Sequence, residues 1–222
     1  MNEIKLVIFD FDNTLYDGKR FALRLVLSDW RHALWAKAER KARKAIAGQD
    51  FGNSVALRNA LFNHMANATK QTPRRMEQWY VASYLPHMVE ILRQSYTARH
   101  NTVEIINNLR EQNIKVAVLS DYPKVSERLI SIGLGDLALP AWSTEELGAL
   151  KPSAVPFAKV ANMLGISAKE TLVIGDRADT DAIGALAAGM KCVLLRGKKS
   201  SNTLGVSELD WTEICNLLIG KQ

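Results

Sequence analysis

From residue 102 onward the sequence alternates short apolar runs with amphipathic stretches, and no other feature limits the possible folds as strongly. The runs are rich in Val, Ile and Leu, and polar residues or glycine follow each one. Runs of this kind are typical of strands buried on both faces of a parallel sheet, with helices between them. Together with one run near the amino terminus, they are residues 4–9, 114–119, 171–174 and 191–195. The pattern predicts an α/β fold in which helices cover both faces of an open parallel sheet.

The connections carry apolar residues at helical spacing. Three helices are therefore predicted, over residues 102–112, 123–132 and 153–164. We expect the second helix to open with Pro123, because proline is favoured in the first helical turn. A weaker apolar run, Leu137–Ser143, contains Pro140, which cannot donate a backbone hydrogen bond. That run is predicted to form an edge strand or a strand start.

The segment from residue 18 to residue 100 breaks the alternation and contains no convincing strand. Apolar residues recur at helical spacing, and Gly48, Gly52 and Pro73 mark the joins between three segments. These segments are residues 19–47, 54–70 and 73–95. We predict a helical insertion over residues 18–100, within a sheet domain made of residues 1–17 and 101–222.

The net charge of +6 is consistent with binding to nucleic acid, with an anionic substrate or with solubility alone. The positions of the charges decide between these explanations. The densest group of basic residues has spacings that distribute it around a helix instead of along one stripe. This group is Lys37, Arg40, Lys41, Arg43 and Lys44. Blocks of like charge are usually solvated, so a solvated helix end is expected.

No segment has the roughly 18 apolar residues of a membrane span, and the amino terminus lacks the pattern of a secretory signal. A cytoplasmic location is therefore expected. Cys192 and Cys215 show neither metal-binding spacing nor a disulfide framework. Both are predicted to be reduced packing residues.

Two acids directly follow the first predicted strand. Asp10 and Asp12 lie at its carboxyl end, where open α/β sheets hold ligands, and strand alternation would place both on one face. Two carboxylates this close repel each other unless a cation or a shared proton reduces the repulsion. Hard oxygen ligands favour Mg²⁺ as that cation. Taken alone, the pair fits a solvent-facing turn equally well.

Three further groups favour a binding site over a turn. Ser120 and Asp121 end the second strand and offer a hydroxyl and backbone N–H groups to a phosphate oxygen. Lys151 is predicted to open the next helix, where it could neutralise phosphoryl charge. The strand over residues 171–174 is followed by three acids, Asp176, Asp179 and Asp181. All these residues are expected at one edge of the sheet.

With DFDNT at 10–14, Ser120, Lys151 and GDRADTD at 175–181 in order, the chain resembles the haloacid dehalogenase-like phosphatases over nearly its whole length. The resemblance implies a Rossmann-like sheet, with the insertion as an all-helical cap over the active site. It also implies Mg²⁺-dependent hydrolysis of a small phosphorylated metabolite through a phosphoaspartate intermediate.

The resemblance carries roles over by position. Asp10 would be the nucleophile, Asp12 the general acid and base, and Lys151 the bridge between nucleophile and phosphoryl group. Substrate-binding residues would be Thr14, Ser120, Asp121 and Lys151. Of these, Thr14 would steady its loop. Metal ligands would be Asp10, the backbone carbonyl of Asp12, Asp176 and a second acid of the last motif. Asp181 is favoured there over Asp179, because the motif is similar to the longer form in the family.

Other activities fit parts of the pattern. A dehalogenase would not need Asp12, whereas a sugar phosphomutase would use the same phosphoaspartate and differ in its cap. A basic nucleic-acid-binding or scaffold protein would leave the site idle. Nucleic acid is disfavoured as a partner, because the basic residues are not interleaved with aromatic ones.

Residues of the insertion are expected to select the leaving group, because the sheet supplies the chemistry. The candidates for this role are Tyr16, Arg20, Arg24, His64, Arg74 and Trp79. Each is more often structural, with Trp79 in the core, His64 on a helix surface and the arginines solvated. The sequence does not predict an oligomeric state.

Overall fold

The computed structural model describes residues 3–197 and 204–220, and within them six parallel strands form one sheet in the order β3-β2-β1-β4-β5-β6. The strands are β1 (Leu6–Phe9), β2 (Lys115–Ser120), β3 (Ala141–Ser143), β4 (Thr171–Gly175), β5 (Lys191–Leu195) and β6 (Ser207–Leu209). The predicted parallel α/β sheet is therefore confirmed. β3 is an edge strand that begins just after Pro140, as expected. β6 was not predicted, because its three residues SEL form no apolar run.

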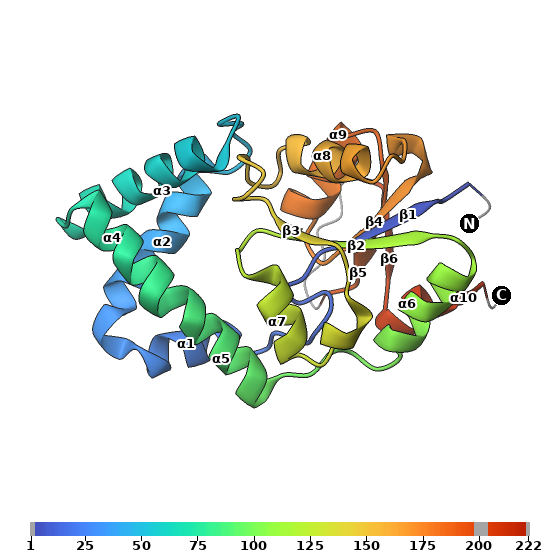
Figure 1. Ribbon diagram of the computed structural model, residues 1–222, viewed down its shortest axis with the longest axis horizontal. Helices are drawn as coiled ribbons and strands as arrows, with labels where there is room; N and C mark the ends of the chain where they lie inside the picture. The colour runs from blue at the N-terminus through green and yellow to red at the C-terminus, as the bar shows by residue number, and fades with distance from the viewer. Residues whose placement is uncertain (1–2, 198–203, 221–222) are drawn as a thin grey trace.

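Helices cover both faces of the sheet (Figure 1). Alternation sends Val7 and Phe9 of β1 to one face and Leu6 and Ile8 to the other. The first face packs against α6 (Thr102–Glu111), α7 (Val125–Ser131) and α10 (Trp211–Ile219). The second packs against α8 (Val155–Met163) and α9 (Ile183–Ala187). Cys192 and Cys215 are buried and free, one on each side of the sheet.

Two predicted helix starts are wrong by a few residues. α7 begins at Val125 instead of Pro123, because Lys124 adopts a left-handed backbone with φ of 60° that cannot continue a helix. Lys151 lies in a turn ahead of α8, which begins only at Val155 and carries Pro156 in its first turn. A turn lets the Lys151 side chain reach back toward the sheet.

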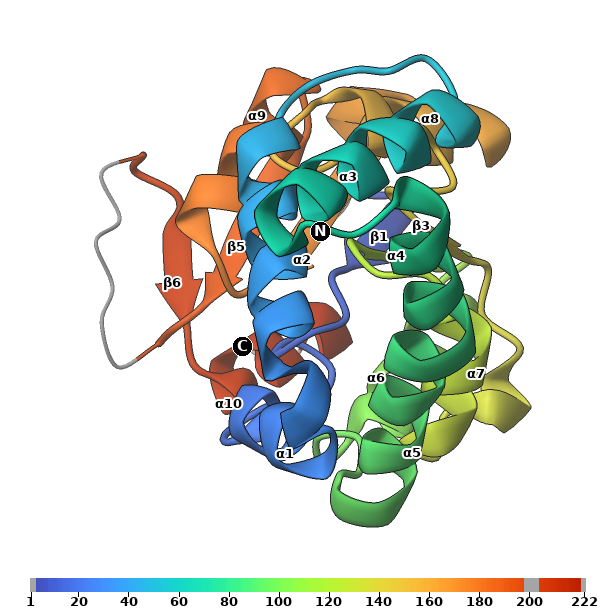
Figure 2. The same ribbon diagram turned by 90° about the vertical axis from the view of Figure 1, so that its left-hand side faces the viewer.

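Five α-helices lie beside one end of the sheet, and Figure 2 shows them from the front. They are α1 (Phe21–Ser28), α2 (Ala33–Ile46), α3 (Ser54–Thr69), α4 (Pro73–Trp79) and α5 (Leu85–Ser95). A separate apolar cluster holds them together, built around Leu57, Leu61 and Met65 of α3 and Met76 of α4. The helical prediction for this segment is confirmed, whereas its division from the sheet as a domain over 18–100 stays a prediction.

Backbone hydrogen bonds tie the five helices to the sheet beside the turn that carries Lys151. The Phe51 N–H donates to Gly148 O over 2.9 Å, and the Gly48 N–H donates to Leu150 O over 3.3 Å. Asp50 and Ala149 form a bridge between them. Helix α2 therefore ends close to the carboxyl edge of the sheet. Among the described residues, no helix is long and apolar enough to cross a membrane.

Candidate active site

A buried carboxylate–ammonium group lies at the carboxyl edge of the sheet. Asp10 follows β1 directly, and its N–H donates to Ile174 O of β4 over 2.8 Å. Lys151 donates to Asp10 Oδ1 over 2.6 Å, to Asp181 Oδ1 over 2.8 Å and to the carbonyl of Leu119 over 2.9 Å. These three acceptors satisfy all three ammonium protons of a side chain that is 2% exposed.

The shifted pKa values indicate that the carboxylates at this edge outnumber the one ammonium group beside them. Burial raises the pKa of Asp10 well above its ordinary value, Lys151 opposes the rise, and Asp181 and Asp176 add to it. Burial and then Asp181 raise the pKa of Asp176 to about 7. Burial alone would lower the pKa of Lys151, but Asp10 and Asp181 outweigh it and raise that pKa. One ammonium therefore leaves residual negative charge at this edge.

This residual charge is concentrated where a cation could bind. Carboxylate oxygens of Asp10, Asp176 and Asp181 lie within 4.8 Å of one another. The second oxygen of Asp181 accepts the N–H groups of Asp176 and Arg177, each over 3.2 Å. Asp179 instead lies at the surface and pairs with Arg177 over 2.6 Å and 2.9 Å. Of the two acids considered for the last motif, Asp181 is the one beside Asp10, and the oxygen-only donor set fits Mg²⁺.

Asp12 is held by a residue that sequence reasoning missed. Arg128 of α7 donates to both carboxylate oxygens of Asp12, over 2.6 Å and 2.7 Å, and to Ser120 Oγ over 2.7 Å. Its guanidinium lies over the Phe11 ring, with 4.1 Å between the guanidinium carbon and the ring centroid. The sequence does contain a signal for its burial, because Arg128 lies between Val125 and Leu129 on the apolar face of α7.

The loop after β1 is fixed from several sides. Thr14 is buried and donates to Asp10 Oδ2 over 3.1 Å, and Tyr16 donates to Asp12 Oδ1 over 2.8 Å. Arg99 donates to the carbonyls of Asn13 and Thr14 over 2.8 Å and 2.9 Å. Asn13 has a φ of 61°, so the chain turns sharply there. These contacts hold both acids of the DFDNT motif at fixed positions.

The Asp121 side chain belongs to the neighbouring loop. Its Oδ1 accepts the Thr144 hydroxyl over 2.8 Å and the Lys151 N–H over 3.4 Å. Its carbonyl accepts Arg43 Nη1 of α2 over 3.0 Å. Its carboxylate is thus committed to the turn that positions Lys151.

A cavity of about 820 Å³ opens between this edge and helices α1, α2 and α5. Asp12, Asn13, Tyr122 and Arg177 line it from the sheet, and Tyr16 lies in its wall. The other five selectivity candidates are not part of the lining. Trp79 is buried in the helical cluster as expected, and Arg20, Arg24, His64 and Arg74 are exposed.

The expected solvated helix end is wrong for Arg43, whereas the other four cations of the basic group of α2 are exposed as expected. Arg43 is buried, where it contacts Glu39 and Tyr80 and donates to Glu145 Oε2 over 2.7 Å. The other four cations all line the cavity beside Asp12. The physical reason is that Arg43 lies on the face of α2 that also buries Glu39 and Ile46.

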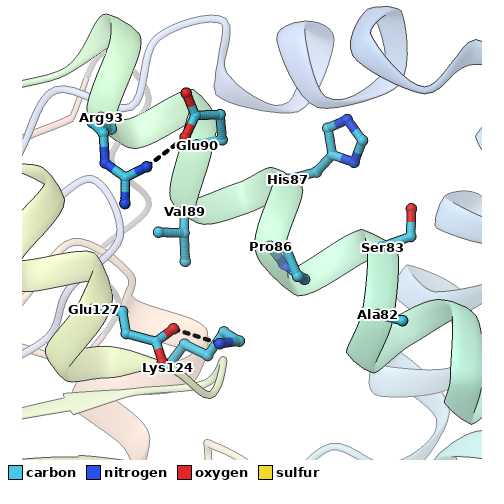
Figure 3. Close-up of a pocket in the computed structure, with 9 residues that line it drawn as sticks. All are labelled: Ala82, Ser83, Pro86, His87, Val89, Glu90, Arg93, Lys124 and Glu127. Atoms are coloured by element: carbon cyan, nitrogen blue, oxygen red, sulfur yellow. Dashed lines mark hydrogen bonds and ion pairs between the residues drawn. The ribbon is translucent and has the colours of Figure 1, made fainter.

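A second hollow, of about 460 Å³, lies between α5 and α7 (Figure 3). Its charged residues are already paired, Arg93 with Glu90 over 2.6 Å and Lys124 with Glu127 over 2.5 Å. None of the acids at the sheet edge lines it. Of these two cavities, the larger one is the one that an acid of the sheet edge, Asp12, lines.

Comparison with known proteins gives a family match over most of the chain. A family model described as haloacid dehalogenase-like hydrolase matches residues 4–189. A ribulose-1,5-bisphosphate 5-phosphatase from Halopiger xanaduensis is 25% identical and the alignment covers 93% of this chain and 91% of the relative. A glyceraldehyde 3-phosphate phosphatase from Methanopyrus kandleri is also 25% identical, with 88% and 85% covered.

Solved structures share the fold. A predicted phosphoglycolate phosphatase from Haemophilus somnus superposes with a TM-score of 0.67 at 20% identity, covering 98% of this chain and 99% of that one. The HAD-hydrolase YfnB from Bacillus subtilis, bound to magnesium, superposes with a TM-score of 0.64 at 20% identity, covering 97% and 98%.

Proposed function

The chain belongs to the haloacid dehalogenase-like hydrolase family, and from this membership we propose that it is a Mg²⁺-dependent phosphatase of a small phosphorylated metabolite. The observation that carries the proposal is the position of Asp10. Its carboxylate is buried, lies 2.6 Å from the Lys151 ammonium and shares the edge with Asp176 and Asp181. The related proteins named above, which act on phosphorylated sugars, support the same reaction class.

In the first step an oxygen of the Asp10 carboxylate attacks phosphorus, and the bond between phosphorus and the leaving oxygen breaks. A carboxylate nucleophile splits one difficult displacement into two easier ones. Lys151 is placed to offset charge on the phosphoryl oxygens, and the Ser120 hydroxyl can donate to one of them. Thr14 donates to the second oxygen of Asp10 and so orients the attacking carboxylate.

Asp12 acts as the general acid in the first step and as the general base in the second. It gives a proton to the leaving oxygen, and then takes one from the water that attacks the phosphoaspartate. This attack regenerates Asp10 and releases phosphate. General acid–base assistance of this kind contributes about 10²- to 10⁴-fold. Arg128 and Tyr16 hold the Asp12 carboxylate by three hydrogen bonds, and so fix its orientation toward the cavity.

The metal would be held by Asp10, Asp176, Asp181 and the backbone carbonyl of Asp12. When bound, Mg²⁺ would supply charge stabilisation for the phosphoryl oxygens. The fit rests on the raised pKa values of Asp10 and Asp176, of which burial is the largest cause. A divalent cation would stabilise both carboxylates in their charged form. Asp181 also accepts two backbone N–H groups, so it orients the loop that carries Asp176.

The test is a panel of phosphorylated sugars and short phosphorylated acids, incubated with the purified chain and Mg²⁺, with free phosphate as the readout. Release of phosphate that is lost in Asp10→Asn and in excess chelator supports the proposal. Transfer of the phosphoryl group to a second position of a sugar, without release of phosphate, would instead indicate a phosphomutase. The cytoplasmic location expected from the sequence stays a prediction.

A further inference from the structure

Four cations form one stripe on α2 that faces the cavity. Lys37, Arg40, Lys41 and Lys44 recur at i, i+3, i+4 and i+7, which places them on one side of the helix. The stripe extends about 10 Å along the helix axis, at 1.5 Å per residue. All four residues are exposed and line the same cavity as Asp12.

The charged groups of these four side chains are exposed to solvent. Among the described residues, no ion pair or side-chain hydrogen bond joins any of them to a carboxylate, whereas the buried Arg43 is paired with Glu39 and Glu145. Solvated cations on a concave wall raise the local concentration of anions. Lys37 and Lys41 also border a smaller hollow beside Lys70, so Arg40 and Lys44 belong most clearly to the main cavity.

The stripe reaches the catalytic edge of the sheet. Arg177 follows Asp176 directly in the last acidic loop and pairs with Asp179 over 2.6 Å. Arg177 itself lines the cavity. The basic wall therefore begins beside the last acidic loop and continues along α2 away from it.

The rest of the helical wall is apolar. Phe21, Leu25, Val26, Ala36 and Met88 line the cavity next to the stripe. A molecule in this cavity would place carbon atoms against these side chains and a charged end against the stripe. The volume of about 820 Å³ suits a small molecule, since ligand pockets commonly measure about 300–1,000 Å³.

We propose that the α2 stripe binds a second anionic group on the leaving group of the substrate, either a phosphate or a carboxylate. This inference rests on the proposed phosphatase function, because the first phosphate must be the one that reacts at Asp10. The physical reason is that Asp10, Lys151 and Ser120 engage only the reacting phosphate. The exposed positive charge of Lys37, Arg40, Lys41 and Lys44 then discriminates among leaving groups.

The test uses three probes built on one carbon skeleton: ethylene glycol monophosphate, phosphoglycolate and ethylene glycol bisphosphate. They differ only in whether the far end is a hydroxyl, a carboxylate or a phosphate. We expect kcat/KM to be about tenfold or more higher for the two probes with a second anion. The carboxylate and phosphate probes, compared with each other, show which anion is preferred.

The diagnostic variant is Arg40→Gln/Lys44→Gln, and Lys169→Gln is the matched control. Glutamine has a helix propensity close to that of lysine and arginine, so α2 is expected to persist. Lys169 is exposed in a turn before β4, at the amino end of the strand. The double variant should lose most of the preference for a second anion, whereas Lys169→Gln should retain it. Added salt should weaken the preference in the wild type.

A second readout separates this inference from the phosphatase proposal. Binding of the three probes to the Asp10→Asn protein is measured by calorimetry, with and without Arg40→Gln/Lys44→Gln. Loss of a binding preference in the variant supports the stripe even when no probe is hydrolysed. Hydrolysis or binding that is equal for all three probes, or unchanged in the variant, would overturn it. A 5′-phosphorylated oligonucleotide that is hydrolysed faster than every probe would also overturn it, in favour of nucleic acid.

Discussion

At the residue scale, Arg128 is the side chain on which the proposed acid and the phosphate-binding hydroxyl both depend. It donates to Asp12 and to Ser120 from within the apolar face of α7. Arg128→Met keeps much of the volume and removes every donor. We expect kcat to fall about 10- to 100-fold, because small displacements of catalytic groups have effects of this size. Steady-state phosphate release measures the change.

Arg128→Lys provides the control for a purely structural role. Lysine keeps the charge but cannot donate to both Asp12 oxygens and Ser120 in a fork. We expect partial recovery of kcat relative to Arg128→Met, with both variants equally folded by circular dichroism. Wild-type kcat in Arg128→Met would show that Asp12 needs no such support.

The difference between Asp10 and Arg128 explains what the sequence could predict. Asp10 follows a recognisable buried strand, so its place at the sheet edge follows from the alternation of strands and helices. Arg128 lies in a helix, and its direction depends on how α7 packs. A basic residue between Val125 and Leu129 does signal a buried charge, but only the three-dimensional packing identifies Asp12 as its partner.

At the element scale, the end of β4 depends on a glycine. A Cβ at Gly175 would lie 2.5 Å from the carboxylate of Asp181. Gly175→Ala should therefore displace Asp181 from Lys151, reduce phosphate release and lower the free energy of unfolding by about 1–3 kcal/mol. Gly197→Ala is the control, because nothing lies within 4 Å of a Cβ there. Equal activity of Gly175→Ala and wild type would contradict the placement of Asp181.

Helix α2 has a buried face and an exposed face, which a matched pair of substitutions can separate. Arg43 is buried among Glu39, Tyr80 and Glu145, whereas Arg40 is exposed in the cavity. Arg43→Met leaves two buried carboxylates without their cation and should cost about 3–5 kcal/mol of unfolding free energy. Arg40→Met should change it by less than about 0.5 kcal/mol. Denaturant unfolding measures both, and similar values for the two variants would refute the assignment of faces.

Two helical segments of the insertion contain breaks that the sequence pattern does not predict. The pattern predicts one helical stretch over 19–47, but the segment divides into α1 and α2 at a short 3₁₀ turn, Trp30–His32. The segment 73–95 is continuous, yet it contains a π-helical turn, Tyr80–Tyr84, just before Pro86. Proline removes a donor and crowds the preceding turn, so a local widening accommodates it. Periodicity predicts that helices exist, but it does not locate such breaks.

At the scale of the whole molecule, the acidic edge should make stability depend on pH and on Mg²⁺. The folded-state pKa values of Asp10 and Asp176 are raised, so the native state keeps protons that the unfolded chain has already lost. Their stabilising effect is full below the ordinary carboxyl pKa of about 4 and is lost as the pH rises through about 7 for Asp176. In chelator, the melting temperature should fall by about 3 °C or more from about pH 5 to about pH 8.

Addition of Mg²⁺ should raise the melting temperature more at about pH 8 than at about pH 5, because metal binding requires deprotonated carboxylates. Scanning calorimetry at both pH values measures the difference. Asp176→Asn should flatten the pH dependence and reduce the effect of Mg²⁺. A melting temperature that is insensitive to pH in chelator would argue against the buried acidic cluster.

The general architecture was the most predictable property of the molecule. Parallel strands bring the acids of β1 and β4 to one edge wherever the chain alternates strand and helix, so the edge is fixed by connectivity. The resemblance implies that the insertion covers the active site, but which side chains of α2 line the cavity could not be predicted, because this depends on side-chain packing and on the pairing of Asp50 with Ala149. For that reason the sequence predicts solvated cations distributed around a helix, but not that four of them line the cavity beside Asp12.

The central claim is that Asp10 carries the phosphoryl group. The most direct measurement is mass spectrometry of enzyme that is quenched in acid during turnover with a substrate from the panel. We expect the peptide containing Asp10 to gain the mass of one phosphoryl group. Asp10→Asn should show no such peptide, and its phosphate release should fall by about 10⁴-fold or more. Phosphate release at the wild-type rate by Asp10→Asn would contradict the claim.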